Sequence, residues 1–143
     1  MTGCVFCRIA SGDLPGNIVH RDDRVAAFLD RSPLFLGHTL VVPRAHVATL
    51  DDLPPELVGP LFEVVRRASI AVQRALGADG SFIAANTRVS QSVPHVHVHV
   101  VPRTEGDGFF SPRPIWRRRS YADDAEAAGY ADRIRASFEA IET

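Results

Sequence analysis

The sequence predicts an α+β fold in which a mainly antiparallel, five-stranded sheet packs against one long helix and a C-terminal helix. Three observations predict this fold. Five short segments carry the β-branched or alternating pattern of strands, one long segment between the third and the fourth has helical periodicity, and a second helical segment follows the fifth. With 143 residues, 45% of them hydrophobic, the chain has the length and the apolar content of a single domain, 1–143.

The first part of the chain predicts a short helix and three strands. Residues 4–12 have the pattern of a short helical turn, and Gly12 is a suitable C-terminal stop for it. The second strand ends at Arg31-Ser32-Pro33, because proline is excluded from the interior of a sheet. The three predicted strands cover 17–20, 24–30 and 37–43.

The long helix is predicted to begin within 51–56, where aspartate and proline favour a helix N-terminus, and to end at Gly77. Its inward face is apolar at helical spacing. The positions on that face are Leu57, Leu61, Val64, Val65, Ala68, Val72 and Leu76. Val58, Phe62 and Ile70 are apolar outside this stripe, so the helix is expected to bury a second side, against another molecule or against the C-terminal helix.

The remaining part predicts two strands, at 81–86 and 95–102, separated by a polar turn over 87–93. Residues 103–120 are rich in glycine, proline and arginine and predict irregular structure. A last helix is predicted over about 122–141. Its apolar face consists of Tyr130, Ile134, Phe138 and Ile141.

Three of the six histidines, His95, His97 and His99, alternate with valine in the fifth predicted strand. Alternation places the three imidazoles on one face of a strand and the valines on the other. Imidazole can transfer protons, attack phosphorus or bind zinc near neutral pH, so this row is the first candidate for a functional site. The alternative is a polar strand face that happens to be rich in histidine.

Composition excludes several classes of function. A net charge of −1 provides no basic field for nucleic acid or for an acidic membrane surface. No apolar run approaches the roughly 20 residues that span a bilayer, and the N-terminus has no secretion signal, so a cytoplasmic protein is expected. Two cysteines three positions apart in such a protein argue against a structural disulfide.

Cys4 and Cys7 have the spacing at which one turn of chain supplies two thiolates to a metal. A thioredoxin-like redox pair has the same spacing, but it requires a strand before the cysteines and a helix after them, a context that residues 1–7 lack. Zinc would need two further ligands.

Taken together, these motifs resemble the histidine triad family. The resemblance depends on the run from His95 to Pro102 with Gln91-Ser92-Val93 before it, and on the run from Gly37 to Pro43 followed by His46. Asp30, at the end of Ala27-Phe28-Leu29-Asp30, matches the acid that binds ribose in this family. The run from Cys4 to Ile9 matches its zinc-containing bacterial members. The resemblance covers a core of 4–103, with a C-terminal extension over 104–143.

The resemblance implies a hydrolase or transferase that acts at the α-phosphate of a nucleoside phosphoramidate or a dinucleoside polyphosphate. His97 would attack phosphorus to form a nucleotidyl-histidine, and water would then release a nucleoside monophosphate. His99 and Ser92 would contact phosphoryl oxygens or the leaving group and stabilise charge in the transition state. A neutral imidazole suits the first step, because it is nucleophilic at pH 7 and does not repel an anionic phosphate.

The resemblance also implies the positions of the nucleotide and of a metal. Asp30 would bind the ribose, and a purine base would lie in an apolar pocket, although ordinary core packing is the alternative for the residues that form it. These are Phe6, Ile9 and Phe28. Asn86 and Gln91 would lie near the phosphates. A structural zinc would be bound by Cys4, Cys7, His46 and His95; without zinc, the two histidines would orient His97 by hydrogen bonds. His20 and His38 are assigned to the surface or to packing.

Relatives in this family form homodimers through the long helix, so a homodimer is expected. Two other functions remain open. One is a nucleotide-binding module with a protein partner and negligible turnover. The other is a metalloprotein that uses all of its histidines and cysteines as ligands.

Overall fold

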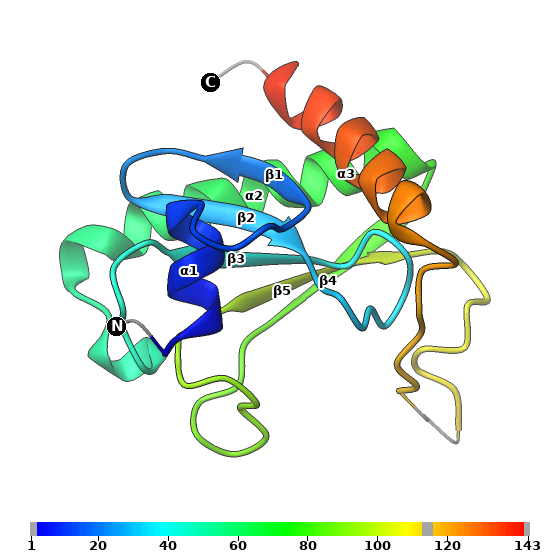
Figure 1. The fold of residues 1–143 in the computed structure, drawn as a ribbon. Coiled ribbons are helices and arrows are strands. Elements are labelled where there is room, and N and C mark those ends of the chain that lie inside the picture. The colour runs from blue at the N-terminus through cyan, green and yellow to red at the C-terminus, as the bar shows by residue number, and fades with distance from the viewer. Residues whose placement is uncertain (1–2, 113–115, 142–143) are drawn as a thin grey trace.

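The computed structural model describes residues 3–112 and 116–141 and contains five strands, three α-helices and one short 3₁₀ helix, η1. All strand pairs are antiparallel, in the order β1-β2-β3-β5-β4 (Figure 1). This architecture confirms the predicted fold class. The elements in chain order are α1 (Val5–Ser11), β1 (Ile18–Arg21), β2 (Val25–Leu29), β3 (Thr39–Pro43), η1 (Leu50–Asp52), α2 (Pro55–Leu76), β4 (Gly80–Ala84), β5 (Val98–Arg103) and α3 (Asp124–Glu139).

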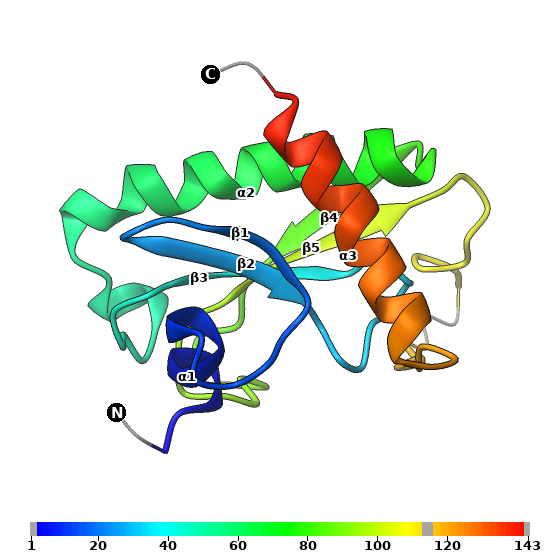
Figure 2. The ribbon, with the colours of Figure 1, turned by 45° about the horizontal axis from the view of Figure 1, so that its top comes forward.

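The sheet separates two apolar clusters. In Figure 2, α2 runs across one face of the sheet and α1 lies on the opposite face, while α3 crosses near one end of α2. Along β2, Ala27 and Leu29 pack towards α2, whereas Ala26 and Phe28 pack towards α1. Both faces are therefore buried, as expected for a strand without polar alternation.

The register of the central strands places the histidines on the α1 face. Phe28 pairs with Leu40, and Leu40 pairs with His99 on the next strand. The neighbouring Val98 and Val100 belong to the cluster under α2. Alternation of side chains thus works as the sequence predicts, with valine on one side and histidine on the other.

The sequence predicts a strand that contains all three histidines of the row, but in the structure the row begins before the strand. β5 starts at Val98, so His95 and His97 lie in the segment that leads into it. Pro43 at the end of β3 has no N–H group to continue the ladder. The leading segment forms a different bond instead, from the Val96 amide to the Val47 carbonyl at 2.8 Å.

The C-terminal part packs against the rest through α3, which contacts α2 and β1. Phe138 and Ile134 of α3 are fully buried in the cluster under α2. Val58 and Phe62 of α2 remain exposed. Within the described parts of the chain, no helix has the length and apolar character needed to cross a membrane.

Candidate functional site

A cavity of about 340 Å³ opens on the face of the sheet that carries α1. Its walls combine apolar side chains with a few convergent polar groups, which is typical of small-ligand sites. The apolar wall includes Phe6, Ile9, Phe28 and Leu40, and the polar groups are Asp30, Arg31, Ser32, Ser92, His97, His99 and Arg118. A larger cavity of about 490 Å³ adjoins it through Ile9, Phe28, Leu29 and Arg31, but none of the histidines lines that space.

His97 is buried, and the backbone determines which of its ring nitrogens carries the proton. Its Nδ1 lies 2.8 Å from the carbonyl oxygen of His95. A carbonyl can only accept, so Nδ1 donates, and the neutral ring keeps an unprotonated Nε2. The ring of Phe6 packs edge-on against His97 at a centroid distance of 5.0 Å. His97 therefore has a fixed orientation and a free lone pair.

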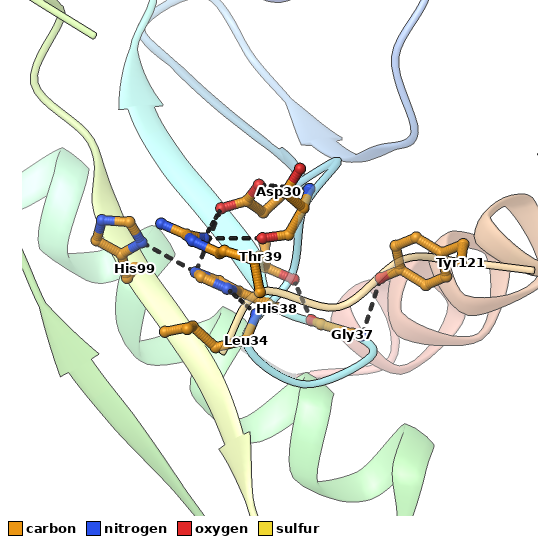
Figure 3. A network of polar contacts seen from close by, with 9 residues as sticks. Asp30, Leu34, Gly37, His38, Thr39, His99 and Tyr121 are labelled. Carbon is orange, nitrogen blue, oxygen red and sulfur yellow. Dashed lines mark hydrogen bonds and ion pairs between the residues drawn. The ribbon is translucent and has the colours of Figure 1, made fainter. Parts of the chain in front are cut away.

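His99 is held by a second histidine, His38. The Leu34 amide donates to His38 Nδ1 at 3.0 Å, and His38 Nε2 lies 2.9 Å from His99 Nδ1. Because the amide can only donate, His38 carries its proton on Nε2 and donates it to His99. Figure 3 shows His38 in this position, between His99 and Asp30. A neutral His99 then has its own proton on Nε2.

Both of these rings are kept neutral. Burial, together with the nearby His99, Arg118 and His97, lowers the pKa of His38 to about 2. Burial also lowers the pKa of His99 to about 4, assisted by His97, while the charge of Asp30 acts in the opposite direction. At neutral pH the pair is therefore uncharged, and His99 is a hydrogen-bond donor through Nε2.

Asp30 is held at both carboxylate oxygens. Oδ1 accepts from the Ser32 amide at 2.9 Å, and Oδ2 accepts from Arg118 Nη1 at 2.8 Å. The nearest histidine nitrogen, Nε2 of His38, is 3.8 Å from Oδ2, which is too far for a hydrogen bond. The carboxylate lines the cavity beside His99.

The structure brings most of the predicted nucleotide-binding residues to one cavity, but two of them do not line it. Ser92 does line it. Asn86 instead donates to the Ser90 carbonyl at 3.2 Å, and Gln91 donates to the carbonyls of Ala48 and Val93. These two amides therefore stabilise the loop that presents Ser92.

The sequence predictions give no role in the site to His38 or Arg118, which hold His99 and Asp30 in place. The sequence predicts a surface or packing role for His38; in the structure it is fully buried and also orients His99. The run of apolar residues that follows it in β3, which is buried, is the sequence feature that indicates burial of His38. Arg118 lies in a segment predicted to be irregular, 88 positions from Asp30, and nothing local indicates its contact. His20 stacks on Phe138 at 4.6 Å, as a packing histidine does.

The four predicted metal ligands also converge. The donor atoms of Cys4, Cys7, His46 and His95 all lie within 4.8 Å of one another. The Sγ atoms of Cys4 and Cys7 are 3.3 Å and 3.4 Å from His95 Nδ1, and Cys7 Sγ is 3.3 Å from His46 Nδ1. Adjacent ligands of a tetrahedral zinc are separated by roughly 3.6 Å, so the spacing fits.

The hydrogen bond on the far side of His95 supports this fit. His95 Nε2 lies 2.8 Å from the Pro43 carbonyl and must donate to it, which leaves Nδ1 unprotonated and directed at the two sulfurs. A second group with metal-ligand chemistry, Asp30, His38 and His99, has donor atoms equally close together. Both ring nitrogens of His38 are engaged there, by Leu34 and by His99, so that group is a hydrogen-bond network.

Known proteins share the sequence and the fold of this chain. The family model described as HIT domain matches residues 11–106. An uncharacterized HIT-like protein of Methanocaldococcus jannaschii is 42% identical over 107 residues, which cover 73% of this chain and 82% of that protein. Adenylylsulfatase HINT3 of Arabidopsis thaliana is 34% identical over 134 residues, which cover 92% of this chain and 68% of that protein. The crystal structure of a zinc-bound histidine triad family protein from Mycobacterium smegmatis has a TM-score of 0.82 and 36% identity, and the match covers 96% of this chain and 94% of that one.

Proposed function

Because this chain belongs to the HIT domain family, we propose that it hydrolyses a nucleotide at the α-phosphate through a covalent nucleotidyl-histidine intermediate. The observation that carries the proposal is the state of His97, whose Nε2 lone pair is free while Nδ1 donates to a backbone carbonyl. A nucleophile oriented by its other ring nitrogen is the arrangement that such catalysis requires. The name adenylylsulfatase of one relative is consistent with attack at an adenylyl phosphorus.

In the first step, Nε2 of His97 forms a bond to the α-phosphorus, and the bond from phosphorus to the leaving group breaks. The ring becomes positively charged because it keeps the proton on Nδ1, and the His95 carbonyl that accepts this proton stabilises the charge. Nε2–H of His99 and the Ser92 hydroxyl donate hydrogen bonds to phosphoryl oxygens. The leaving group departs with the bonding electron pair, and an amine leaving group takes up a proton from solvent. Water then attacks the same phosphorus as the bond from Nε2 to phosphorus breaks, and the proton of the water goes to solvent. This step releases the nucleoside monophosphate and returns His97 to its neutral form.

The remaining cavity residues bind the rest of the nucleotide. Asp30 accepts hydrogen bonds from the ribose hydroxyls, and a purine packs against Phe6, Ile9 and Phe28, which line the apolar wall. The leaving group is an amine or a second phosphate chain. Phosphoramidates and dinucleoside polyphosphates both satisfy this description, and a panel of the two substrate classes decides between them.

We further propose that Cys4, Cys7, His46 and His95 hold a structural zinc ion. Zinc in such a site would cross-link the chain. It would have no coordination position for water or substrate, because four protein ligands complete the tetrahedron. Its effect on the reaction passes through His95, because the carbonyl of that residue holds His97 in its nucleophilic form. A zinc-bound relative of the same fold supports the assignment.

His97→Ala is expected to abolish turnover of a nucleoside phosphoramidate while AMP still binds, because the apolar wall and Asp30 remain. The matched control is His20→Gln, which changes a histidine outside the cavity. Mass spectrometry of the wild-type protein, quenched during turnover, should detect a nucleotidyl adduct at His97. A His97→Ala protein with near-native kcat would refute the mechanism. A wild-type protein that binds AMP without turnover would favour a nucleotide-binding module instead.

A further inference from the structure

The segment 118–121 lies along the loop 30–37 and is bonded to it at several points. The Arg119 amide donates to the Pro33 carbonyl at 2.7 Å, and Arg119 Nε donates to the Leu34 carbonyl at 2.8 Å. Further along, the Gly37 amide donates to the Tyr121 hydroxyl at 2.9 Å (Figure 3). The C-terminal extension thus supports the loop that carries Asp30.

Arg118 is the member of this segment that enters the cavity. Its Nη1 donates to Asp30 Oδ2 at 2.8 Å and to the Ser32 carbonyl at 2.9 Å. The Asp30 side chain is only 16% exposed, whereas that of Arg118 is 48% exposed. The guanidinium therefore holds the inner carboxylate from the solvent side without closing the cavity.

The hydrogen bonds of Asp30 define what remains for a ligand. A carboxylate accepts about four hydrogen bonds, two at each oxygen. The Ser32 amide uses one position on Oδ1, and Arg118 uses one on Oδ2. One position per oxygen is left, which matches two adjacent hydroxyl groups that each donate one hydrogen bond.

We propose that Arg118 is a positioning residue that determines sugar specificity: it fixes the Asp30 carboxylate so that both oxygens face the cis-diol of a ribose. This inference rests on the proposed nucleotide site. Without Arg118, the carboxylate is held at Oδ1 alone, can rotate about its χ2 bond and can bond to water. The gain in affinity from the second hydroxyl of the ribose then decreases, while the contacts of the protein with the base and the phosphate remain.

Calorimetric titration of AMP and 2′-deoxy-AMP tests this proposal without depending on turnover. The wild-type protein should bind AMP about tenfold or more tightly than the deoxy ligand, because a hydrogen bond to a charged group is lost. In Arg118→Ala the ratio should decrease towards one, mainly through weaker AMP binding, and Arg118→Lys should restore part of it. Asp30→Asn provides the reference for a protein that has lost the charged acceptor.

The matched control is Arg119→Ala, which removes a side-chain bond between the same two segments without touching Asp30. It should keep the wild-type ratio of affinities. An unchanged ratio in Arg118→Ala, or an equal decrease in Arg119→Ala, overturns the role of Arg118. A wild-type protein that binds AMP without preferring the ribose also overturns it and leaves the proposed catalysis standing. A wild-type protein that binds neither ligand overturns the nucleotide site itself.

Discussion

At the scale of single residues, the chemistry of the site depends on which nitrogen of each imidazole carries the proton. Three backbone groups settle this point, because each can play only one role in a hydrogen bond: the carbonyls of His95 and Pro43 accept, and the amide of Leu34 donates. In the neutral rings this leaves a lone pair on Nε2 of His97, a proton on Nε2 of His99 and a lone pair on Nδ1 of His95. The sequence predicts that His95, His97 and His99 share one face, but it does not predict their partners. Pro43 lies 52 positions from His95, and His38 lies 61 positions from His99.

The buried neutral histidines predict a loss of stability in mild acid. The pKa of His38 is about 2 and that of His99 about 4 in the folded protein, below the usual value of 6.5. The unfolded chain therefore binds more protons below pH 6.5 than the folded chain does. The contribution of the two neutral rings to the free energy of unfolding is fully present above pH 6.5. It decreases as the pH falls, by up to about 1.4 kcal/mol per pH unit for each ring.

Urea denaturation between pH 6.5 and pH 5 measures this slope in a range above the titration of ordinary carboxylates. The charged and titratable groups that influence the His38 pKa are His99, His97 and Arg118, and Asp30 lies nearby. His38→Gln removes one of the two rings, so its slope should be smaller than that of the wild-type protein. Identical slopes in the two proteins would show that His38 does not titrate on unfolding.

At the scale of elements, α1 has seven residues and is too short to be stable alone. Phe6 and Ile9 pack it against the sheet, and Cys4 and Cys7 connect its first turn to His46 and His95. A metal at these four residues would join chain segments about 90 positions apart, as a long-range cross-link. The helix also forms part of the cavity wall, so its attachment and the shape of the cavity are coupled.

Cys4→Ser is expected to lower the zinc content of the purified protein and its melting temperature. A ligand that binds only the folded state, at a free concentration a thousand times its Kd, stabilises that state by about 4 kcal/mol. Arg8→Ala is the control on the same helix, because Arg8 is exposed and is not a candidate ligand. Full zinc content in Cys4→Ser, measured by elemental analysis of protein purified without chelators, would contradict the assignment.

Periodicity predicts the elements with strong internal patterns. The long helix, the order of the strands along the chain and the opposite sides of valine and histidine all follow from spacing. The start of β5 does not, because it depends on the missing N–H group of Pro43 in another strand. The contact of Arg118 with Asp30 could not be predicted from the sequence either, because irregular segments have no periodic pattern and this contact joins residues 88 positions apart.

At the scale of the whole molecule, part of the apolar surface has no partner within the described chain. Val58 and Phe62 lie four positions apart on α2, a spacing that puts them on one side of the helix, and they are 43% and 39% exposed. Ile83, on the edge strand β4, is 39% exposed and pairs with Val100, which belongs to the cluster under α2. The C-terminal helix α3 contacts α2, but Val58 and Phe62 stay exposed, so α3 does not cover them.

A homodimer with twofold symmetry is therefore predicted, with α2 and the edge of β4 in the interface. Light scattering at micromolar concentration should give twice the chain mass of 15.6 kDa. Phe62→Glu should shift the protein to the monomer, because a carboxylate would be buried without a partner. Val89→Glu, at an exposed loop position away from α2, should leave the mass unchanged. A monomeric wild-type protein would refute the prediction.

The hydrogen bond from the Leu34 amide to His38 also limits proton transfer between the cavity and the interior of the protein. A backbone amide does not release its proton at ordinary pH. A proton therefore cannot be passed from Leu34 through His38 to His99. Within the described part of the chain, His99 and His38 thus provide no relay of protons from the cavity into the interior. In the proposed reaction, a proton gained by a departing amine or lost by an attacking water would therefore be exchanged with bulk solvent at the mouth of the cavity, directly or through the side chains that line it.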